Sequence, residues 1–305
     1  VILNPNVCND EFDLKTFNIV KERLRREINS LKENPVKQSI KEAIKTMDSN
    51  SPTSYEILGT IEELENITPA KLYNAYKSLR KNFKVDVFLI GNLDMDNVAS
   101  LIKKYFKNRY IVSDNFEVMV DNKETKKVKE KTMKSDNIQT NLVMLFNLKN
   151  LSELEKNITL NCFNYLYGSG GLTSKLYKSI REENSLCYAI NSMYLKYDKL
   201  LMVQISLDNC NVKKAISLVK KELKSMQNGN FSEEEVRDAI NNMVISLDMS
   251  LDNNIAILNN YVFNIYDKLP SIEERKEYFK KLTKEDIVNV SKKVKLNTIF
   301  TLEGR

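Results

Sequence analysis

The chain has 305 residues, a length that predicts two domains, and its 47 basic side chains are intermixed with 41 acidic ones. No apolar run approaches the ~18 residues of a membrane span and no signal peptide is recognisable, so we expect no membrane partner and a cytoplasmic location. A nucleic-acid partner is not expected either, because the lysine-rich stretch at residues 123–134 contains glutamates and no aromatic residue. This stretch is interpreted as an exposed linker.

Histidine is absent from the sequence, and this limits the chemistry that the chain can perform. A catalytic triad with a histidine base is excluded, and so is a histidine-ligated metal site built by this chain alone. The four cysteines share no Cys-x-x-Cys spacing, which is typical of reduced thiols rather than of a disulfide framework. The sequence opens with Val1 instead of methionine, and we expect it to be processed or to be a fragment of something longer.

Helix-capping residues mark the first half of the chain. Phe12 and a capping Asp13 precede an amphipathic helix, and Thr68 caps a later helix that leads into a short strand at residues 87–91. One more helix is expected at residues 94–106.

The second half of the chain alternates strands and helices. The predicted elements are, in chain order, a strand at 140–148, a helix at 153–167, strands at 186–196 and 200–207, and a helix at 211–227. Further helices and a final strand follow. This order predicts an α+β fold in which helices pack on a mostly antiparallel sheet.

The two halves share an internal repeat. Phe12 and Phe231 each precede a capped helix, Thr68 and Thr283 each cap a later helix, and both copies end in a strand followed by glycine. The spacings are nearly equal, so we infer two homologous domains. Because the first copy has no counterpart of the strands and helices before Phe231, the chain is divided into three parts. They are the C-terminal part of a first domain (1–115), a linker (116–135) and a complete second domain (136–305).

The segment GSGGLTSKLYKSIREENSLCYAI, residues 168–190, resembles a signature of the insulinase-type (pitrilysin-like) zinc metallopeptidases. The matching residues are Gly170–Gly171, Ser174, Leu176–Tyr177, Arg181–Glu182 and Leu186–Cys187–Tyr188. The resemblance runs through essentially the whole chain, in particular to the small bacterial members related to mitochondrial processing peptidase. It implies paired α+β domains of like fold, which the internal repeat indicates independently.

The resemblance implies a zinc site that this sequence cannot complete. Family enzymes bind Zn²⁺ through two histidines of an inverted motif, His-x-x-Glu-His, and through a glutamate of a later helix. Glu27 falls at the place of that glutamate, provided that the motif is encoded before Val1. It is alternatively an ordinary charge on a highly charged helix. A further family acid would fall on Val20, which departs from the pattern of a working zinc site.

Arg181 and Tyr188 are the candidate catalytic residues. In the family such a pair comes from the second domain and faces the zinc, where both side chains donate hydrogen bonds to a scissile carbonyl and stabilise the oxyanion. The alternatives are an arginine at a helix C-terminus favoured by the helix dipole, and a strand aromatic with a buried ring.

Gly170, Gly171 and Ser174 are candidate substrate-binding residues, because the resemblance extends to a glycine-rich loop that contacts substrate in mitochondrial relatives. Local reasoning instead makes the glycines of this segment a helix stop, followed by Thr173 or Ser174 as a helix cap. A phosphate-binding loop is excluded, because no Gly-Lys-Ser/Thr follows.

Three functions remain open. The first is a zinc-less component of an endopeptidase that hydrolyses peptides in an enclosed chamber, with a zinc-bearing homologous subunit or a second copy as its partner. The second is a truncated part of a single-chain zinc peptidase. The third is a non-enzymatic binding protein. Zinc is the family's cofactor, and none is expected to be bound by this chain alone.

Overall fold

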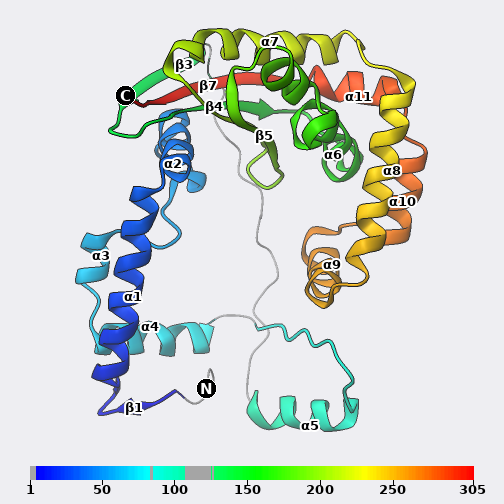
Figure 1. The fold of residues 1–305 in the computed structure, drawn as a ribbon. Helices are drawn as coiled ribbons and strands as arrows, with labels where there is room; N and C mark the ends of the chain where they lie inside the picture. Colours follow the sequence, from blue (N-terminus) through cyan, green and yellow to red (C-terminus); the bar gives the residue numbers. More distant parts are fainter. Residues whose placement is uncertain (1–4, 83–84, 107–124, 126) are drawn as a thin grey trace. The chain divides into compact units, whose positions relative to one another are not determined.

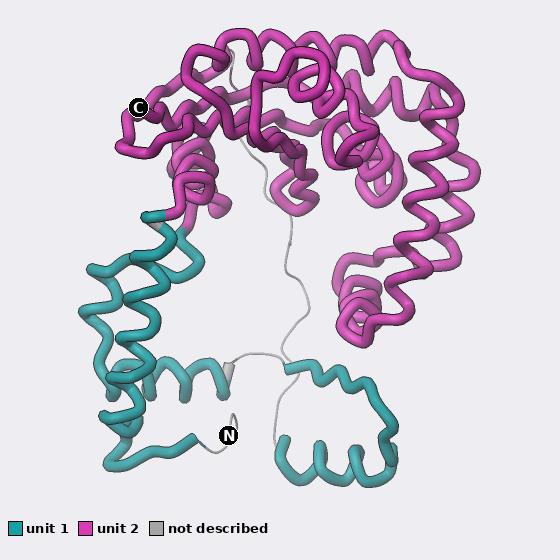
Figure 2. Tube along the Cα trace, in the orientation of Figure 1, with its two compact units in different colours: residues 1–33, 56–117 teal, residues 34–55, 118–305 magenta. Residues whose placement is uncertain are grey.

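The computed structural model describes residues 5–82, 85–106, 125 and 127–305. These residues divide into two compact units, Val1–Glu33 with Glu56–Glu117, and Asn34–Tyr55 with Val118–Arg305 (Figure 2). The unit boundaries are therefore not those of the predicted duplicated domains, because residues 34–55 pack with the second half of the chain. The predicted boundary between residues 115 and 116 lies outside the described ranges.

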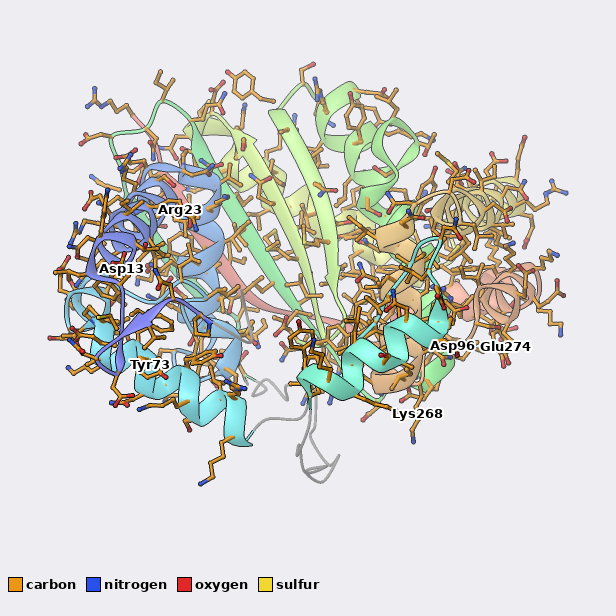
Figure 3. The ribbon with its side chains drawn as sticks, turned by 90° about the horizontal axis from the view of Figure 1, so that it is seen from below. Asp13, Arg23, Tyr73, Asp96, Lys268 and Glu274 are labelled. Carbon is orange, nitrogen blue, oxygen red and sulfur yellow. The ribbon has the colours of Figure 1, made fainter. Side chains whose placement is uncertain are left out.

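Unit 1 consists of helices and a two-stranded antiparallel sheet. Its elements are β1 (Val7–Cys8), β2 (Glu11–Phe12), α1 (Leu14–Glu33), α3 (Ile61–Glu65), α4 (Pro69–Asn82) and α5 (Met95–Tyr105). The predicted caps are present, since Asp13 Oδ2 accepts a hydrogen bond from the Thr16 amide (2.8 Å) and Thr68 Oγ1 accepts one from the Lys71 amide (3.2 Å). Figure 3 labels Asp13, which directly precedes the first residue of α1, and Tyr73 on α4.

The predicted strand at residues 87–91 is not formed. Residues 85–90 have no regular secondary structure, and the side chains of Val87 and Leu89 are 43% and 53% exposed. A strand needs neighbours that satisfy its backbone N–H and C=O groups. In the described part of unit 1 the only sheet is the β1–β2 pair, so this apolar segment lacks a partner that its sequence pattern presupposes.

Unit 2 contains a five-stranded mixed sheet with the order β3-β7-β4-β6-β5. The strands are β3 (Lys129–Lys134), β4 (Thr140–Leu148), β5 (Cys187–Leu195), β6 (Leu200–Leu207) and β7 (Val294–Glu303). All neighbours are antiparallel except β3 and β7. The predicted mostly antiparallel sheet is confirmed.

The linker interpretation is corrected for residues 129–134, which form β3. These residues resembled a linker because they are highly charged, and such charges also suit an exposed edge strand.

The helical elements of unit 2 are α2 (Pro35–Met47), η1 (Pro52–Ser54), η2 (Glu155–Thr159), α6 (Leu160–Asn164), η3 (Tyr165–Ser169), η4 (Gly171–Thr173), η5 (Tyr177–Glu182), η6 (Asn209–Asn211), α7 (Val212–Gln227), α8 (Glu233–Ser250), α9 (Asn254–Asp267), α10 (Ile272–Lys280) and α11 (Lys284–Ser291). From residue 155 onward they follow the predicted order, whereas α2 and η1 were not predicted. No helix in the described ranges combines the length and the apolar character needed to cross a membrane.

Both faces of the sheet are covered (Figure 1). Along β4 the side chains of Leu142, Met144 and Phe146 enter the larger core, which also contains buried residues of α6, α7 and α11. The alternate residues Val143 and Leu145 enter a second core under α2. This alternation explains why β4 is apolar from Leu142 to Phe146. It also makes α2, from the first half of the chain, part of the fold of the second half.

The internal repeat is visible in the helices. Asn34 and Asn253 cap α2 and α9 in the same way, each accepting a hydrogen bond from the amide three residues later. The separation is 219 positions (253 − 34), and it recurs between the first residues of α1 and α8 (233 − 14). Capping boxes begin α3 and α10, and Figure 3 labels Glu274 in the first turn of α10.

Candidate functional site

Close packing around Gly168 shapes the segment with the family signature. A Cβ atom added to Gly168 would lie 2.6 Å from Ser192 Oγ and 2.8 Å from Leu176 Cδ1. One added to Gly170 would lie 2.6 Å from the Tyr165 carbonyl oxygen. Only Gly171 has a positive φ, +59°, and the space around it is open. Two of these glycines therefore permit close approach and one makes the turn.

We expect Gly168→Ala to destabilise unit 2 by about 1–3 kcal/mol, because the added methyl group overpacks the contact between η3 and β5. Gly171→Ala is the matched control. It adds no clash and should cost about 1 kcal/mol through its left-handed backbone alone. Urea unfolding of both variants measures the difference; equal midpoints would show that Gly168 is not a packing glycine.

Ser174 is buried and its side chain stabilises the turn at Gly171. Its hydroxyl donates to the Gly171 carbonyl oxygen (2.8 Å), and its own carbonyl oxygen accepts from the Lys178 amide (3.0 Å). The helix thus resumes after Ser174, but the side chain points back to the turn and does not cap the helix. These contacts give Ser174 a structural role; a role in substrate binding stays a prediction for Gly170, Gly171 and Ser174.

Arg181 lies near the end of η5, a π-helical segment, with its side chain exposed. Leu176 and Ile180 are fully buried in the core and fix the orientation of this segment. The Arg181 guanidinium lies 5.1 Å from the centre of the Tyr177 ring, a cation–π contact that limits its motion. Burial raises the pKa of the Cys187 thiol, and the nearby Arg181 charge partly opposes this shift. The Ser185 amide donates a hydrogen bond to the Arg181 carbonyl oxygen (3.1 Å), so the Arg181 backbone contacts the chain two residues before β5 begins.

Tyr188 is the second residue of β5, at an irregularity in its pairing with β6. Its hydroxyl donates a hydrogen bond to Asp208 Oδ1 (3.0 Å), and its ring is 53% exposed. This hydrogen bond, together with the Asp208 charge, raises the pKa of Tyr188, so that the phenol stays protonated and able to donate. The predicted arrangement of helix end, polar break and strand is confirmed by η5 and β5, but each side chain has a separate local partner.

Strand β5 forms one edge of the sheet. Its nine residues include no charged side chain, whereas β3 at the opposite edge has four charges in six residues. Lysine-rich edges resist pairing with another strand, and a neutral edge permits it. In the middle of β5, the Ser192 carbonyl accepts a hydrogen bond from Asn164 (3.4 Å). The first part of this edge strand, which contains the exposed Tyr188 and follows Arg181, is suited to bind an extended peptide, whereas Asn164 occupies the Ser192 carbonyl.

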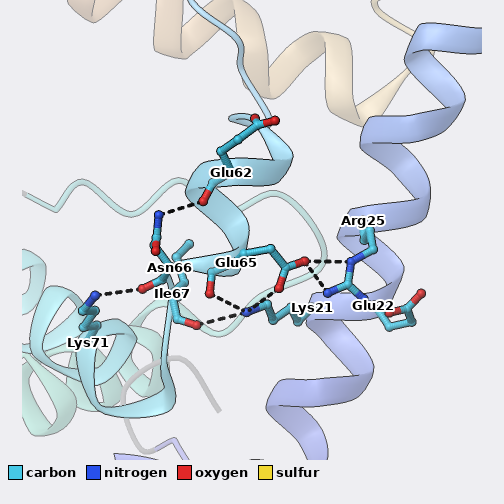
Figure 4. Close-up of polar contacts among 8 residues, drawn as sticks. All are labelled: Lys21, Glu22, Arg25, Glu62, Glu65, Asn66, Ile67 and Lys71. Atoms are coloured by element: carbon cyan, nitrogen blue, oxygen red, sulfur yellow. Dashed lines mark hydrogen bonds and ion pairs between the residues drawn. The ribbon is translucent and has the colours of Figure 1, made fainter.

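Glu27 lies on the exposed surface of α1, and its neighbours belong to a charged network (Figure 4). Arg25 Nε donates to Glu65 Oε1 (3.0 Å), and Lys21 Nζ donates to the carbonyl oxygens of Glu65 and Ile67 (3.2 Å each). The Arg25 guanidinium holds the pKa of Glu65 below its ordinary value. The network joins α1 to α3 and does not include Glu27.

The donor set does not fit a zinc ion. The sequence has no histidine, and in the described ranges no three His, Cys, Asp or Glu side chains are grouped so that they could hold a metal. Glu27 would be a single carboxylate ligand, whereas Zn²⁺ takes three or four. No catalytic step is therefore assigned to a metal on this chain.

Comparison with known proteins identifies the family. Residues 66–243, more than half of the chain, match the model of the peptidase M16 inactive domain. The chain belongs to this family. The match confirms the resemblance to insulinase-type peptidases. It also agrees with a histidine-free sequence that lacks the catalytic zinc motif.

Individual relatives support the assignment to this M16 family. The whole chain is 25% identical, over 310 residues and 71% of the relative, to the probable inactive metalloprotease YmfF of Bacillus subtilis (strain 168). A conserved protein from Enterococcus faecalis V583 has the same fold over the whole chain and 72% of its own length, with a TM-score of 0.90 and 23% identity. A chain of complex III2 from Candida albicans matches 93% of this chain and 70% of its own, with a TM-score of 0.72 and 17% identity. M16-like folds therefore occur as subunits of a larger assembly.

The sequence-based prediction did not assign Asp208 or Tyr177 a role beside the candidate catalytic residues. Asp208 binds Tyr188 from 20 positions away, because the β5–β6 hairpin brings the two together. Tyr177 supplies the ring beneath Arg181. The signature contains Tyr177 as its aromatic position, and a spacing of four residues on a helix could have paired it with Arg181. Nothing in the sequence singles out Asp208.

Proposed function

We propose that this M16 chain is a non-catalytic component of a zinc-dependent endopeptidase, in which it binds the peptide and polarises its scissile carbonyl. The observation that carries the proposal is the placement of Arg181 and Tyr188 at the start of the uncharged edge strand β5. The zinc and its histidines come from a homologous subunit, because this chain has no histidine.

An extended peptide would add to β5 as a further strand. Main-chain hydrogen bonds give such binding its affinity, and side-chain pockets give it specificity. Because β5 is neutral, apolar or uncharged segments are the favoured substrates. The chamber that encloses them is part of the proposal and is formed with the zinc-bearing partner.

The two donors have different roles in the proposed mechanism. Arg181 would direct the N–H groups of its guanidinium at the oxyanion. Tyr188 would exchange its Asp208 hydrogen bond for one that its phenol O–H donates to the carbonyl oxygen. Hydrogen bonds aimed at developing charge lower the barrier to peptide hydrolysis.

A second candidate function is a single-chain zinc peptidase whose His-x-x-Glu-His motif is encoded before Val1. Glu27 on α1 would then be its third ligand. Val20 argues for the first function over this one, because a family acid is replaced there by an apolar residue. The relative in Bacillus subtilis is itself named a probable inactive metalloprotease.

Hydrolysis of a quenched fluorogenic peptide distinguishes these functions. The chain alone should show none, and an equimolar zinc-bearing homologous subunit should restore turnover that a chelator abolishes. Turnover by the chain with its own upstream residues and zinc, without a partner, would favour the single-chain peptidase. Peptide binding without hydrolysis under every condition would favour a binding protein.

A further inference from the structure

A cavity of about 440 Å³ lies in unit 2 where β4 ends and β6 begins. It is at the opposite end of β5 from Tyr188, because the turn between β5 and β6 supplies part of its wall. Small-molecule sites are commonly of this size. No acidic residue is among the described residues that line it, which are three lysines, two asparagines and two leucines: Asn147, Leu148, Lys149, Asn150, Leu151, Lys156 and Lys199.

Hydrogen bonds fix the walls of this cavity. On one side, the Leu148 amide donates to the Lys199 carbonyl oxygen (2.9 Å), which joins the end of β4 to the β5–β6 turn. On the other side, Lys293 Nζ donates to the Asn150 carbonyl oxygen (2.7 Å) and to Glu155 Oε2 (2.8 Å), which joins the loop after β4 to η2. A ligand therefore meets a formed cavity and does not have to order the chain on binding.

The three lysines reach the cavity from separate segments. Lys149 follows β4, Lys156 belongs to η2 and Lys199 precedes β6, and all three are half-buried. Lys156 pairs with Glu153 Oε1 (2.7 Å), but the Glu153 carboxylate is 73% exposed, and exposed pairs of this kind contribute little. Ammonium groups that line one cavity repel each other, and an anion between them replaces this repulsion by attraction.

The composition of the lining indicates the class of anion. Lysine binds phosphate as a point charge, whereas a planar carboxylate is matched best by the arginine fork, and the described lining contains no arginine. Asn147 and Asn150 add side-chain amides, which can donate hydrogen bonds to phosphate oxygens. Leu148 and Leu151 add an apolar surface, which suits the carbon part of an organic phosphate.

We propose that this cavity binds a small phosphorylated molecule. Its phosphate group would lie among the ammonium groups of Lys149, Lys156 and Lys199, and its carbon part would contact Leu148 and Leu151. This site goes beyond the proposed peptidase role and does not depend on it, since none of the residues assigned to peptide binding lines the cavity.

Calorimetric titration of the 305-residue chain with inorganic phosphate and with phenyl phosphate tests the proposal. Chloride keeps the ionic strength constant, so that general screening is the same throughout. One phosphate should bind per chain with a Kd of about 1 mM or lower. Phenyl phosphate should bind more tightly, because its ring buries apolar surface against the leucines. Lys156→Gln and Lys199→Gly should each weaken the binding of both about tenfold.

Lys268→Gly is the matched control for Lys199→Gly. Both lysines have a left-handed backbone, with φ of +50° at Lys199 and +49° at Lys268, and Lys268 lies outside the cavity, directly after α9 (Figure 3). Glycine at either position removes one charge and relieves the same backbone strain, so the Tm should change to a similar extent in both variants. Phosphate binding should weaken in Lys199→Gly and stay unchanged in Lys268→Gly.

Three results would overturn the proposal. The first is the absence of saturable phosphate binding at constant ionic strength. The second is equal weakening by Lys199→Gly and Lys268→Gly, since the anion would then respond to the net charge of the chain and not to this cavity. The third is binding of benzoate, the carboxylate analogue, as tight as that of phenyl phosphate, since the cavity would then not select phosphate.

Discussion

Arg181→Ala and Tyr188→Phe are each expected to lower peptide hydrolysis by the complex with a zinc-bearing subunit about 10²-fold or more. Each removes one donor from the proposed oxyanion site, and loss of such a donor typically costs this much in kcat. In the proposed function the substrate is held mainly by main-chain hydrogen bonds along β5, so KM should change less than kcat. Steady-state kinetics with a fluorogenic peptide measure both constants.

Matched variants separate this role from a general effect on folding. Arg237→Ala removes an exposed arginine of α8, and Tyr261→Phe removes the hydroxyl of a 66% exposed tyrosine of α9. Both should keep full activity. If Arg181→Ala and Tyr188→Phe turn over as fast as these controls, the two residues have no part in catalysis and the proposed role is refuted.

Phe300→Ala should destabilise unit 2 by about 3–5 kcal/mol. The Phe300 side chain is fully buried on β7, in the core that joins the sheet to α2, and its removal leaves a cavity between them. The loss should therefore appear in two measurements. Chemical denaturation gives the change in the free energy of unfolding, and hydrogen exchange should show faster opening of α2 together with the sheet.

Phe263→Ala is the control for this prediction, since it removes the same side chain from an exposed site on α9. In the 305-residue chain it should change stability by no more than about 1 kcal/mol. A loss of stability in Phe300→Ala without faster exchange in α2 would mean that residues 34–55 are not an integral part of unit 2.

The alternation and capping patterns of the second half determine its secondary structure. The strand at residues 140–148 is confirmed as β4 with the same ends. Its apolar side chains enter the cores on both faces of the sheet, which accounts for the continuous apolar run that predicted a strand. The helix predicted at residues 211–227 begins one residue later as α7. The family, too, follows from the sequence, since residues 168–190 contain the residue types of the family signature in the same order and at the same spacing.

The prediction at residues 87–91 failed for a physical reason. The local pattern of apolar residues indicates that a segment favours a strand. A strand forms only when a neighbouring strand satisfies its backbone N–H and C=O groups. The same limit applies to β3, whose charges resembled those of a linker until β7 was seen to pair with it. In both cases the local pattern does not tell whether the segment has a strand beside it.

What the sequence determined by itself was the family, the repeat, the secondary structure of the second half and the absence of a histidine zinc site. Each depends on residue type and short spacing. Tertiary structure alone decided that Asp208 binds Tyr188, that β5 is a neutral edge, and that α2 covers the sheet of the other half of the chain. These are contacts between residues far apart in the chain, and they depend on strand pairing and on the burial of apolar faces, which no local pattern encodes.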